Sequence, residues 1–324
     1  MSDSAHWSFP TPLQPDVRRI EFDLDQALNA VVRLTINIPD DAFTANTLGT
    51  ERAGNGVVIR DDGLILTIGY LITEADSIWI ATNDGRVMEG HALAYDFATG
   101  LGLVMPLGAL NIAPLTPGES TSVDVDDDVY VIGHGGRSHA LKAQLFARRE
   151  FAGYWEYLLD GALFTTPPHP EWSGAALLDG DGQLIGIGSL YVQEPHADDT
   201  RKGNMFVPID VLLPVLDDLV TSGRPAGPGR PWLGVYAEEE SNRVIVGAVA
   251  KGGPAERAGI RQGDAIIAVA NRQVATLAEL FRSVWRLGPS GTEIPLTLAR
   301  GESLLPVNVR SADRGDFLKK PSLQ

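Results

Sequence analysis

Short apolar runs, each bounded by turn residues, dominate the chain up to about residue 210. The turns include Arg60-Asp61-Asp62-Gly63 and Asn83-Asp84-Gly85, where glycine is free to adopt a positive φ. Many short strands at regular spacing predict an all-β barrel or sandwich for this part of the chain. The predicted strands cover residues 30–38, 57–59, 64–67, 78–82, 129–132, 141–146 and 184–190.

Two stretches have the periodicity of amphipathic helices instead. The first is expected to begin at Asp210, whose side chain would cap it, and to run to Val220. The second is predicted over 276–287, where apolar residues recur on one face. Further strands are expected at 244–249, 265–269 and 295–298. One strong helix among several strands indicates a smaller α+β unit at the C-terminal end.

A boundary between two domains is predicted at 223–231, where six of nine residues are Gly or Pro. Neither a helix nor a strand is expected to run through such a segment. The charge changes at the same place. Residues 1–229 carry 13 basic and 32 acidic side chains, whereas residues 230–315 carry 11 basic and 9 acidic ones. The two parts are therefore chemically different units.

The composition excludes several classes of function. With 42 acidic and 26 basic residues and a net charge of −16, the chain lacks the basic surplus that nucleic-acid binding requires. No run approaches the ~18 apolar residues that a membrane span needs. No cysteine is present for disulfides, thiol catalysis or metal ligation. No set of His, Asp and Glu has the spacing of metal ligands, so neither a metal nor a cofactor is expected.

The chain length indicates the number of domains, and the N-terminal sequence indicates where the protein is located. A chain of 324 residues is expected to hold about two domains. The N-terminal sequence MSDSAHWSFPTPL has no basic segment followed by an apolar one, so no signal peptide is predicted. We therefore expect a cytoplasmic protein, or a periplasmic one if the sequence has been trimmed.

Several motifs follow one another in a fixed order: GNGVVI at 54–59, DGLILT at 62–67, DGR at 84–86, Ser173-Gly174 followed by DGDGQLIGI at 179–187, and FVPI at 206–209. In order and spacing they resemble the HtrA family of trypsin-like serine proteases, which carry a C-terminal PDZ domain. The resemblance covers roughly residues 20–310. It implies a mainly β fold, a trypsin-like double β-barrel followed by an α+β PDZ domain. The implied division is an N-terminal extension (1–20), a protease-fold domain (21–222), a linker (223–231), a PDZ domain (232–312) and a tail (313–324).

The motif WLGV at 232–235, with GGPAERAGI at 252–260 and GDAIIAV at 263–269, resembles the PDZ domains of that family. In such a domain a peptide adds a strand to a sheet edge, and N–H groups of a loop hold its terminal carboxylate. The resemblance implies peptides or unfolded polypeptides with apolar C-termini as ligands. The alternative is that the apolar helix face only forms a core. The implied peptide-binding residues are Trp232, Leu233, Gly234, Val235, Leu280, Phe281 and Val284.

The catalytic motif of the family is retained at one of its three positions. Ser173 matches the nucleophile, but Tyr70 takes the place of the His base, and Gly100 takes the place of the Asp that orients it. Glu171 replaces a Gly whose N–H contributes to the oxyanion hole, and it adds a negative side chain. A tyrosine is protonated at pH 7, so it donates a hydrogen bond where a base must accept a proton.

The chain has six histidines that could supply a substitute base. His169 lies four residues before Ser173, so a rebuilt dyad is an alternative, although prolines at 167, 168 and 170 stiffen the backbone around it. His134 is interpreted as an exposed loop residue. Without a base, a related triad enzyme loses on the order of 10⁶ in kcat.

Three functions are compatible with these residues. We favour an HtrA-like pseudoprotease, inactive or strongly impaired, that binds peptides or unfolded chains through its PDZ domain in protein quality control. One alternative is an active serine endopeptidase that uses Ser173 with an unconventional base. Another is an interaction scaffold that binds no peptide. The resemblance also implies a homo-oligomer, in particular a trimer.

Overall fold

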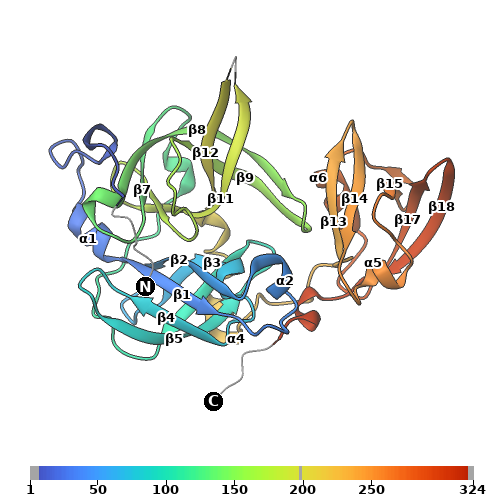
Figure 1. Cartoon of the computed structure of the whole chain (residues 1–324), viewed down its shortest axis with the longest axis horizontal. Helices are drawn as coiled ribbons and strands as arrows, with labels where there is room; N and C mark the ends of the chain where they lie inside the picture. Colours follow the sequence, from blue (N-terminus) through green and yellow to red (C-terminus); the bar gives the residue numbers. More distant parts are fainter. Residues whose placement is uncertain (1–6, 197–198, 320–324) are drawn as a thin grey trace. The chain divides into compact units, whose positions relative to one another are not determined.

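The computed structural model describes residues 7–196 and 199–319, which form two compact units (Figure 1). Among these residues, the first unit holds 7–149, 161–196, 199–225 and Lys319, and the second holds 150–160 and 226–318. The boundary after residue 225 falls inside the linker expected at 223–231. Residues 150–160, which lie inside the expected protease-fold range, cluster with the second unit.

Six antiparallel strands close the first barrel of the first unit, in the order β1-β2-β3-β6-β5-β4. From its second residue on, strand β1 alternates buried and exposed residues, as a strand with one face toward a core does. Its register sets Leu34 opposite Gly54 on one side and Ile80 on the other. The strands are β1 (Val31–Asn37), β2 (Glu51–Val58), β3 (Ile65–Ile68), β4 (Ser77–Ala81), β5 (Val87–Tyr95) and β6 (Leu101–Pro106).

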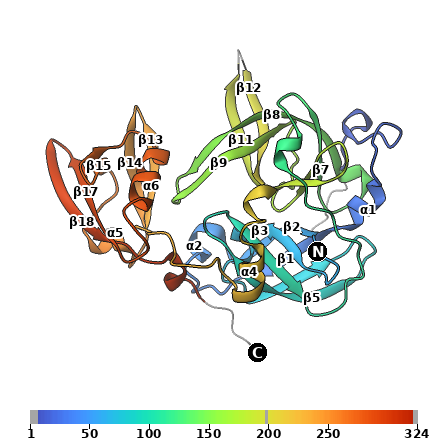
Figure 2. The ribbon, with the colours of Figure 1, turned by 180° about the vertical axis from the view of Figure 1, so that it is seen from behind.

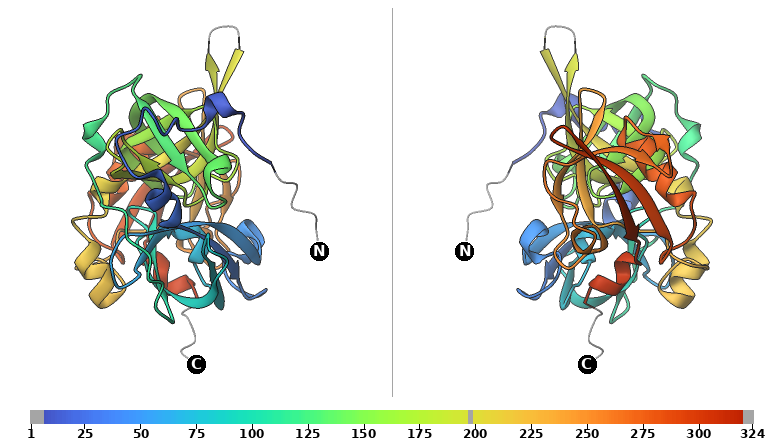
Figure 3. Two further views of the ribbon diagram at one scale, coloured as in Figure 1. Left: turned by 90° about the vertical axis from the view of Figure 1, so that its left-hand side faces the viewer. Right: turned by 90° about the vertical axis from the view of Figure 1, so that its right-hand side faces the viewer.

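A second closed barrel follows in the order β10-β11-β12-β9-β8-β7. The apolar run at 141–146 predicted only the first half of β8, because the second half is partly exposed and lacks the apolar signal of a core strand. Strands β11 and β12 pair as a long hairpin (Figure 3). The strands are β7 (Asp128–Ile132), β8 (Ala140–Gly153), β9 (Tyr157–Thr166), β10 (Ala176–Leu178), β11 (Leu184–His196) and β12 (Asp199–Pro208).

The predicted helix at Asp210 begins six residues later than expected, as α4 (Leu216–Ser222) (Figure 2). Pro214 disfavours the helical conformation at the residue before it and has no N–H to donate. Asp210 caps no helix. Its carboxylate accepts the N–H of Ser120 at 3.1 Å. The other helical segments of this unit are α1 (Leu24–Asn29), α2 (Ala45–Leu48), α3 (Gly69–Ile72), η1 (Thr11–Leu13), η2 (Ser120–Ser122), η3 (Arg137–His139) and η4 (Ile209–Val211).

The second unit contains a six-stranded sheet in the order β13-β14-β15-β17-β18, with β16 paired to β15. Two α-helices and a 3₁₀ turn accompany it: α5 (Pro254–Arg257), α6 (Leu277–Trp285) and η5 (Arg314–Phe317). The strands are β13 (Val235–Glu240), β14 (Arg243–Val249), β15 (Ala265–Val269), β16 (Arg272–Gln273), β17 (Glu293–Arg300) and β18 (Ser303–Arg310).

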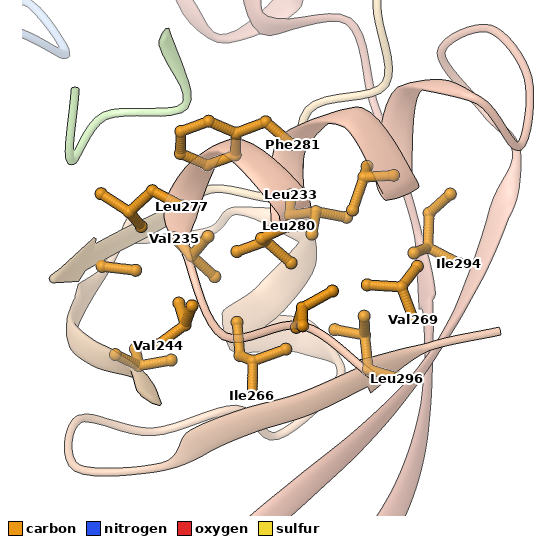
Figure 4. Close-up of a cluster of buried hydrophobic side chains, with 14 of the residues drawn as sticks. Leu233, Val235, Val244, Ile266, Val269, Leu277, Leu280, Phe281, Ile294 and Leu296 are labelled. Atoms are coloured by element: carbon orange, nitrogen blue, oxygen red, sulfur yellow. The ribbon is translucent and has the colours of Figure 1, made fainter. Parts of the chain in front are cut away.

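The apolar face of α6 forms the core of this unit with the inner face of the sheet. Figure 4 shows Leu280 of the helix in the middle of the cluster and Leu277 beside Val235, with Ile266 and Leu296 of the strands across from the helix and the ring of Phe281 at the edge. The helix ends two residues before the predicted limit, and Leu287 is exposed. Two closed barrels and a separate α+β unit are the mainly β fold that the resemblance implied.

Helix α6 begins with a capping box. The Thr276 hydroxyl accepts the N–H of Glu279 at 3.1 Å, and the Glu279 carboxylate accepts the N–H groups of Thr276 and Ala275. The sequence T-x-x-E before an apolar run is the pattern of such a cap. The cap fixes where the helix starts against the sheet.

We predict that Thr276→Ala destabilises α6 by about 1 kcal/mol, because an N–H of the first turn loses its acceptor. Native-state hydrogen exchange would show the amides of 281–285 exchanging about fivefold faster. Ser303→Ala, at an exposed position of the same unit, is the control and leaves those rates unchanged. Equal exchange rates in Thr276→Ala and the unchanged protein would show that the cap contributes nothing.

Candidate functional site

Ser173 and Tyr70 come from different barrels and meet in the first unit. Ser173 lies on the loop between β9 and β10, and Tyr70 lies in α3, the helical turn directly after β3. Tyr70 Oη lies 2.7 Å from Ser173 Oγ and 2.9 Å from the main-chain oxygen of Ser189. Two residues that the motif alignment assigned to one site, 103 positions apart, are thus in direct hydrogen-bond contact.

The direction of these hydrogen bonds follows from counting protons. A phenol has one proton, and a carbonyl oxygen only accepts, so Tyr70 donates to Ser189. The proton between Tyr70 and Ser173 therefore comes from the serine hydroxyl. Ser173 donates to a phenol oxygen that already holds its own proton, and such an oxygen is a very weak base.

Burial keeps the phenol of Tyr70 neutral. It raises the pKa of Tyr70 to about 12, and the hydrogen bond with Ser173 opposes only part of that rise. At pH 7 the phenolate is then about one molecule in 10⁵. Arg52 fixes the turn that carries Tyr70, because its Nη1 donates to the carbonyls of Tyr70 at 2.7 Å and Thr73 at 3.1 Å. Tyr70 is anchored as a hydrogen-bond partner of Ser173.

Gly100, at the position of the triad Asp, closes a turn. Its φ is +77°, its N–H donates to the carbonyl of Asp96 at 2.8 Å, and its own carbonyl accepts the N–H of Gly69 at 2.8 Å. The carboxylate of Asp96 lies in the same turn and is buried. It accepts the N–H groups of Ala98 at 3.0 Å and Thr99 at 3.1 Å. The Asp96 carboxylate thus stabilises the backbone of the turn. Gly100 itself has no carboxylate that could orient a base.

The N–H of Glu171, expected at the oxyanion hole, is already engaged. It donates to Nδ1 of His169 at 3.0 Å. An oxyanion hole needs N–H groups aimed at the place where the charge will develop, and this N–H is aimed at an imidazole. The Glu171 side chain extends toward Arg33, at 3.8 Å, and His139, at 3.9 Å. The arrangement as it stands is not that of an oxyanion hole.

His169 is fully buried, and both ring nitrogens have partners other than Ser173. Because Nδ1 accepts the N–H of Glu171, the ring proton is assigned to Nε2, which donates to the carbonyl of His139 at 2.7 Å. Burial lowers the pKa of His169 to about 4, so the ring is neutral at pH 7. The structure therefore does not form the His169–Ser173 dyad considered as an alternative.

His134 also differs from its expected surroundings. It was interpreted as an exposed loop residue, but it is half-buried, and burial lowers its pKa. Its backbone N–H donates to the side-chain oxygen of Asn55 at 2.8 Å. The loop at 133–136 is thus tied to the neighbouring barrel, which the glycine-rich sequence did not indicate.

The loop at 232–235 in the second unit holds a carboxylate of the chain itself. The N–H groups of Leu233, Gly234 and Val235 donate to the side chain of Glu156 at distances of 2.6–3.2 Å. These are the backbone groups that the resemblance assigned to a peptide's terminal carboxylate. Glu156, at the tip of the β8–β9 hairpin, had no signal in the sequence.

The other residues implied in peptide binding are all buried. Trp232 pairs its N–H and its carbonyl with Ala312, at 3.0 Å each, so its N–H does not bind the Glu156 carboxylate. Leu280, Phe281 and Val284 belong to the core cluster of this unit together with Leu233 and Val235. The apolar helix face is therefore core in this state of the molecule.

A metal site and a membrane-spanning helix each place requirements on the described residues. Within 7–196 and 199–319, no group of three or more His, Asp or Glu side chains is placed to hold a metal ion. No helix of the described chain is long and apolar enough to cross a membrane. The polar groups of both candidate sites are instead paired with groups of the chain.

Both parts of the chain match models of known protein families. Residues 54–187 match the family model of the trypsin-like peptidase domain, and residues 231–310 match that of the PDZ domain. The chain belongs to the HtrA family. Ser173 lies within the peptidase match, and the carboxylate loop lies within the PDZ match.

HtrA relatives and a solved structure cover most of the chain. A periplasmic serine endoprotease, DegP-like, of Halomonas elongata is 27% identical over 82% of this chain, which spans 57% of that relative's length. The serine endoprotease DegS of Escherichia coli is 27% identical over 82% of this chain and 78% of its own length. The crystal structure of a serine endoprotease from Yersinia pestis superposes with a TM-score of 0.53 at 25% identity, covering 90% of this chain and 98% of that one.

Asn55 holds the loop that carries Ser173, and no motif of this HtrA chain indicated that role. Its N–H donates to the carbonyl of Ser173 at 2.7 Å, and its Nδ2 donates to the carbonyl of Glu171 at 2.8 Å. Gly174 approaches so closely that a Cβ there would lie 1.9 Å from the Asn55 carbonyl oxygen. The available signal was an amide side chain inside a buried strand, where a polar group must be paired.

The buried, neutral His169 predicts a pH dependence of stability. Its pKa is about 4 in the fold against 6.5 in a model peptide, so the unfolded chain takes up a proton first as the pH falls. The free energy of unfolding therefore falls as the pH drops from 6.5 toward 4. Urea unfolding of the unchanged protein and of His169→Asn would differ in their loss of stability between pH 7 and pH 5 by about 2 kcal/mol. An identical loss in both proteins would refute this role.

Proposed function

We propose that this HtrA-family chain does not cleave peptide bonds and instead binds peptide or polypeptide C-termini through its PDZ domain. The observation that carries the first part is the direction of the hydrogen bond from Ser173 to Tyr70. A serine nucleophile must give its proton to a base, and the phenol that receives this hydrogen bond already holds its own proton. Gly100 and the engaged N–H of Glu171 remove two further parts of the catalytic machinery.

The carboxylate loop supports the second part of the proposal. Three successive N–H groups converge on one carboxylate, which is the chemistry that recognises a free C-terminus. The apolar residues Leu233 and Val235 flank these groups. Ligands with an apolar last side chain fit such a loop best.

An active serine endopeptidase is the second candidate, because the relatives with the same domain order carry the name serine endoprotease. In this chain it would need Tyr70 as an ionised base. The two candidates differ in how reactivity depends on pH, since a phenolate with a pKa of about 12 becomes tenfold more abundant with each pH unit up to that value.

We predict that a fluorophosphonate serine probe leaves Ser173 unlabelled at pH 7 and at pH 10, and that an unfolded casein stays intact. A change from His to Tyr at the base position removes on the order of 10⁶ in rate, as loss of the base does in a related triad enzyme. Intact-protein mass spectrometry after incubation would measure the labelling.

Ser173→Ala provides the background for this experiment, and an active trypsin-like protease provides the positive control. Labelling or casein cleavage that is lost in Ser173→Ala would contradict the pseudoprotease. A Ser173-dependent rate that rises tenfold per pH unit would identify Tyr70 as the base and establish the endopeptidase instead.

A further inference from the structure

The tip of the β8–β9 hairpin belongs to the PDZ unit, although the strands that carry it belong to the second barrel. It comprises residues 150–160, and Glu156 is its turn residue. Glu156 has a φ of +61°, a left-handed conformation that a glutamate rarely adopts. Its side chain is nevertheless buried. Strained backbone and a buried carboxylate at a hairpin tip require a specific partner.

That partner is the carboxylate loop. Oε1 of Glu156 accepts the N–H of Gly234 at 2.6 Å and that of Val235 at 3.0 Å, while Oε2 accepts the N–H of Leu233 at 2.9 Å. Gly234 has a φ of +78°, which lets consecutive N–H groups face one anion. Both oxygens are used, as both oxygens of a terminal carboxylate would be.

The backbone of the tip lies beside β13 in the way an added strand does. The N–H of Ala237 donates to the carbonyl of Tyr154 at 3.0 Å. Ala237 lies two residues after Val235, and Tyr154 lies two residues before Glu156, so the spacing on the two segments is matched. A main-chain hydrogen bond at this edge is how a peptide augments a sheet.

Apolar and charged contacts complete the docking. Leu158 is buried in the same cluster as Leu233, Val235 and the helix residue Leu280. Arg282 of α6 pairs with Glu150, at 2.5 Å, and with Asp160 on the other arm of the hairpin. These ion pairs are exposed, so each contributes little. The carboxylate and Leu158 are the buried side chains of this contact, and the ring of Tyr154 adds a contact with Tyr236 at a centroid distance of 6.2 Å.

Burial of the carboxylate is costly for the docked state. Desolvation raises the pKa of Glu156 to about 7, against the three N–H groups and the more distant Arg314, which lower it. A docked segment that loses hydration in this way is more easily exchanged for a ligand that makes the same bonds from an unstrained, extended backbone.

We propose that residues 150–160 are a built-in ligand of the PDZ groove, with Glu156 in the place of a peptide's terminal carboxylate. A peptide with a free C-terminus and an apolar last side chain then binds only when this segment has left. The inference rests on the peptide-binding function proposed above. The apparent dissociation constant for a peptide equals the intrinsic one divided by the fraction of molecules whose groove is open.

The test uses the full chain and a fluorescein-labelled heptapeptide that copies residues 150–155 and ends in a leucine with a free carboxylate. Fluorescence anisotropy would show the peptide binding to Glu156→Gln at least tenfold more tightly than to the unchanged protein. The reason is that a neutral amide loses the charge-assisted bonds and faces the loop with its own NH₂ donors. Glu156→Ala, which removes the acceptor entirely, is expected to behave in the same way.

Two controls accompany this measurement. Glu302→Gln changes the same charge at an exposed turn of the same unit and leaves the affinity within twofold. The heptapeptide with an amidated C-terminus binds none of the proteins, because it brings no carboxylate. Circular dichroism confirms that each variant is folded before titration.

The outcomes separate this inference from the proposed function. Equally tight binding to the unchanged protein and to both Glu156 variants overturns the built-in ligand and leaves peptide binding in place. Failure of all folded variants to bind the free-acid peptide overturns both.

Discussion

The single proton of the Tyr70 phenol determines what the barrel unit can do. It is donated to the carbonyl of Ser189, which has no proton to pass on, so the hydrogen-bond chain from Ser173 ends there. In a working triad the serine donates to an imidazole nitrogen, and the second ring nitrogen donates to a carboxylate. Ser173 donates to Tyr70 as a triad serine donates to its imidazole, but a protonated phenol oxygen is a far weaker base. The carboxylate of the turn at Gly100, that of Asp96, is bound to the N–H groups of that turn.

The second site depends on the pairing of buried polar groups. Buried N–H groups and carboxylates must find partners within the protein when water cannot reach them. At 233–235 the partner is Glu156, and at Glu171 the partner of the N–H is His169. Both places that a ligand would use in a functional relative are thus satisfied by groups of this chain. The consequence differs between them, because an N–H of the PDZ loop can exchange one carboxylate for another, whereas no exchange gives Ser173 a base.

Much of this could be predicted from the sequence. The strand runs and the amphipathic helix at 276–287 are local patterns, and such patterns depend little on the rest of the chain. The pairing of Ser173 with Tyr70 came from motif order, which carries long-range information. The sequence did not show where a backbone N–H group points or which distant residues lie close together. It did not show that the Glu171 N–H points at His169, because that depends on the loop geometry set by Asn55. It missed Glu156 for the same reason, since the segment that carries it is partly exposed strand with no motif and contacts a loop 77 residues away.

The most direct test of this account is a neutron crystal structure of the protein after exchange into deuterated solvent. The account predicts one deuterium on Tyr70 Oη, directed at the Ser189 carbonyl, and one on Ser173 Oγ, directed at Tyr70. A deuterium on Tyr70 directed at Ser173 would contradict it, because Tyr70 would then be the donor. A phenol oxygen without deuterium would also contradict it, because Tyr70 would then be an ionised base.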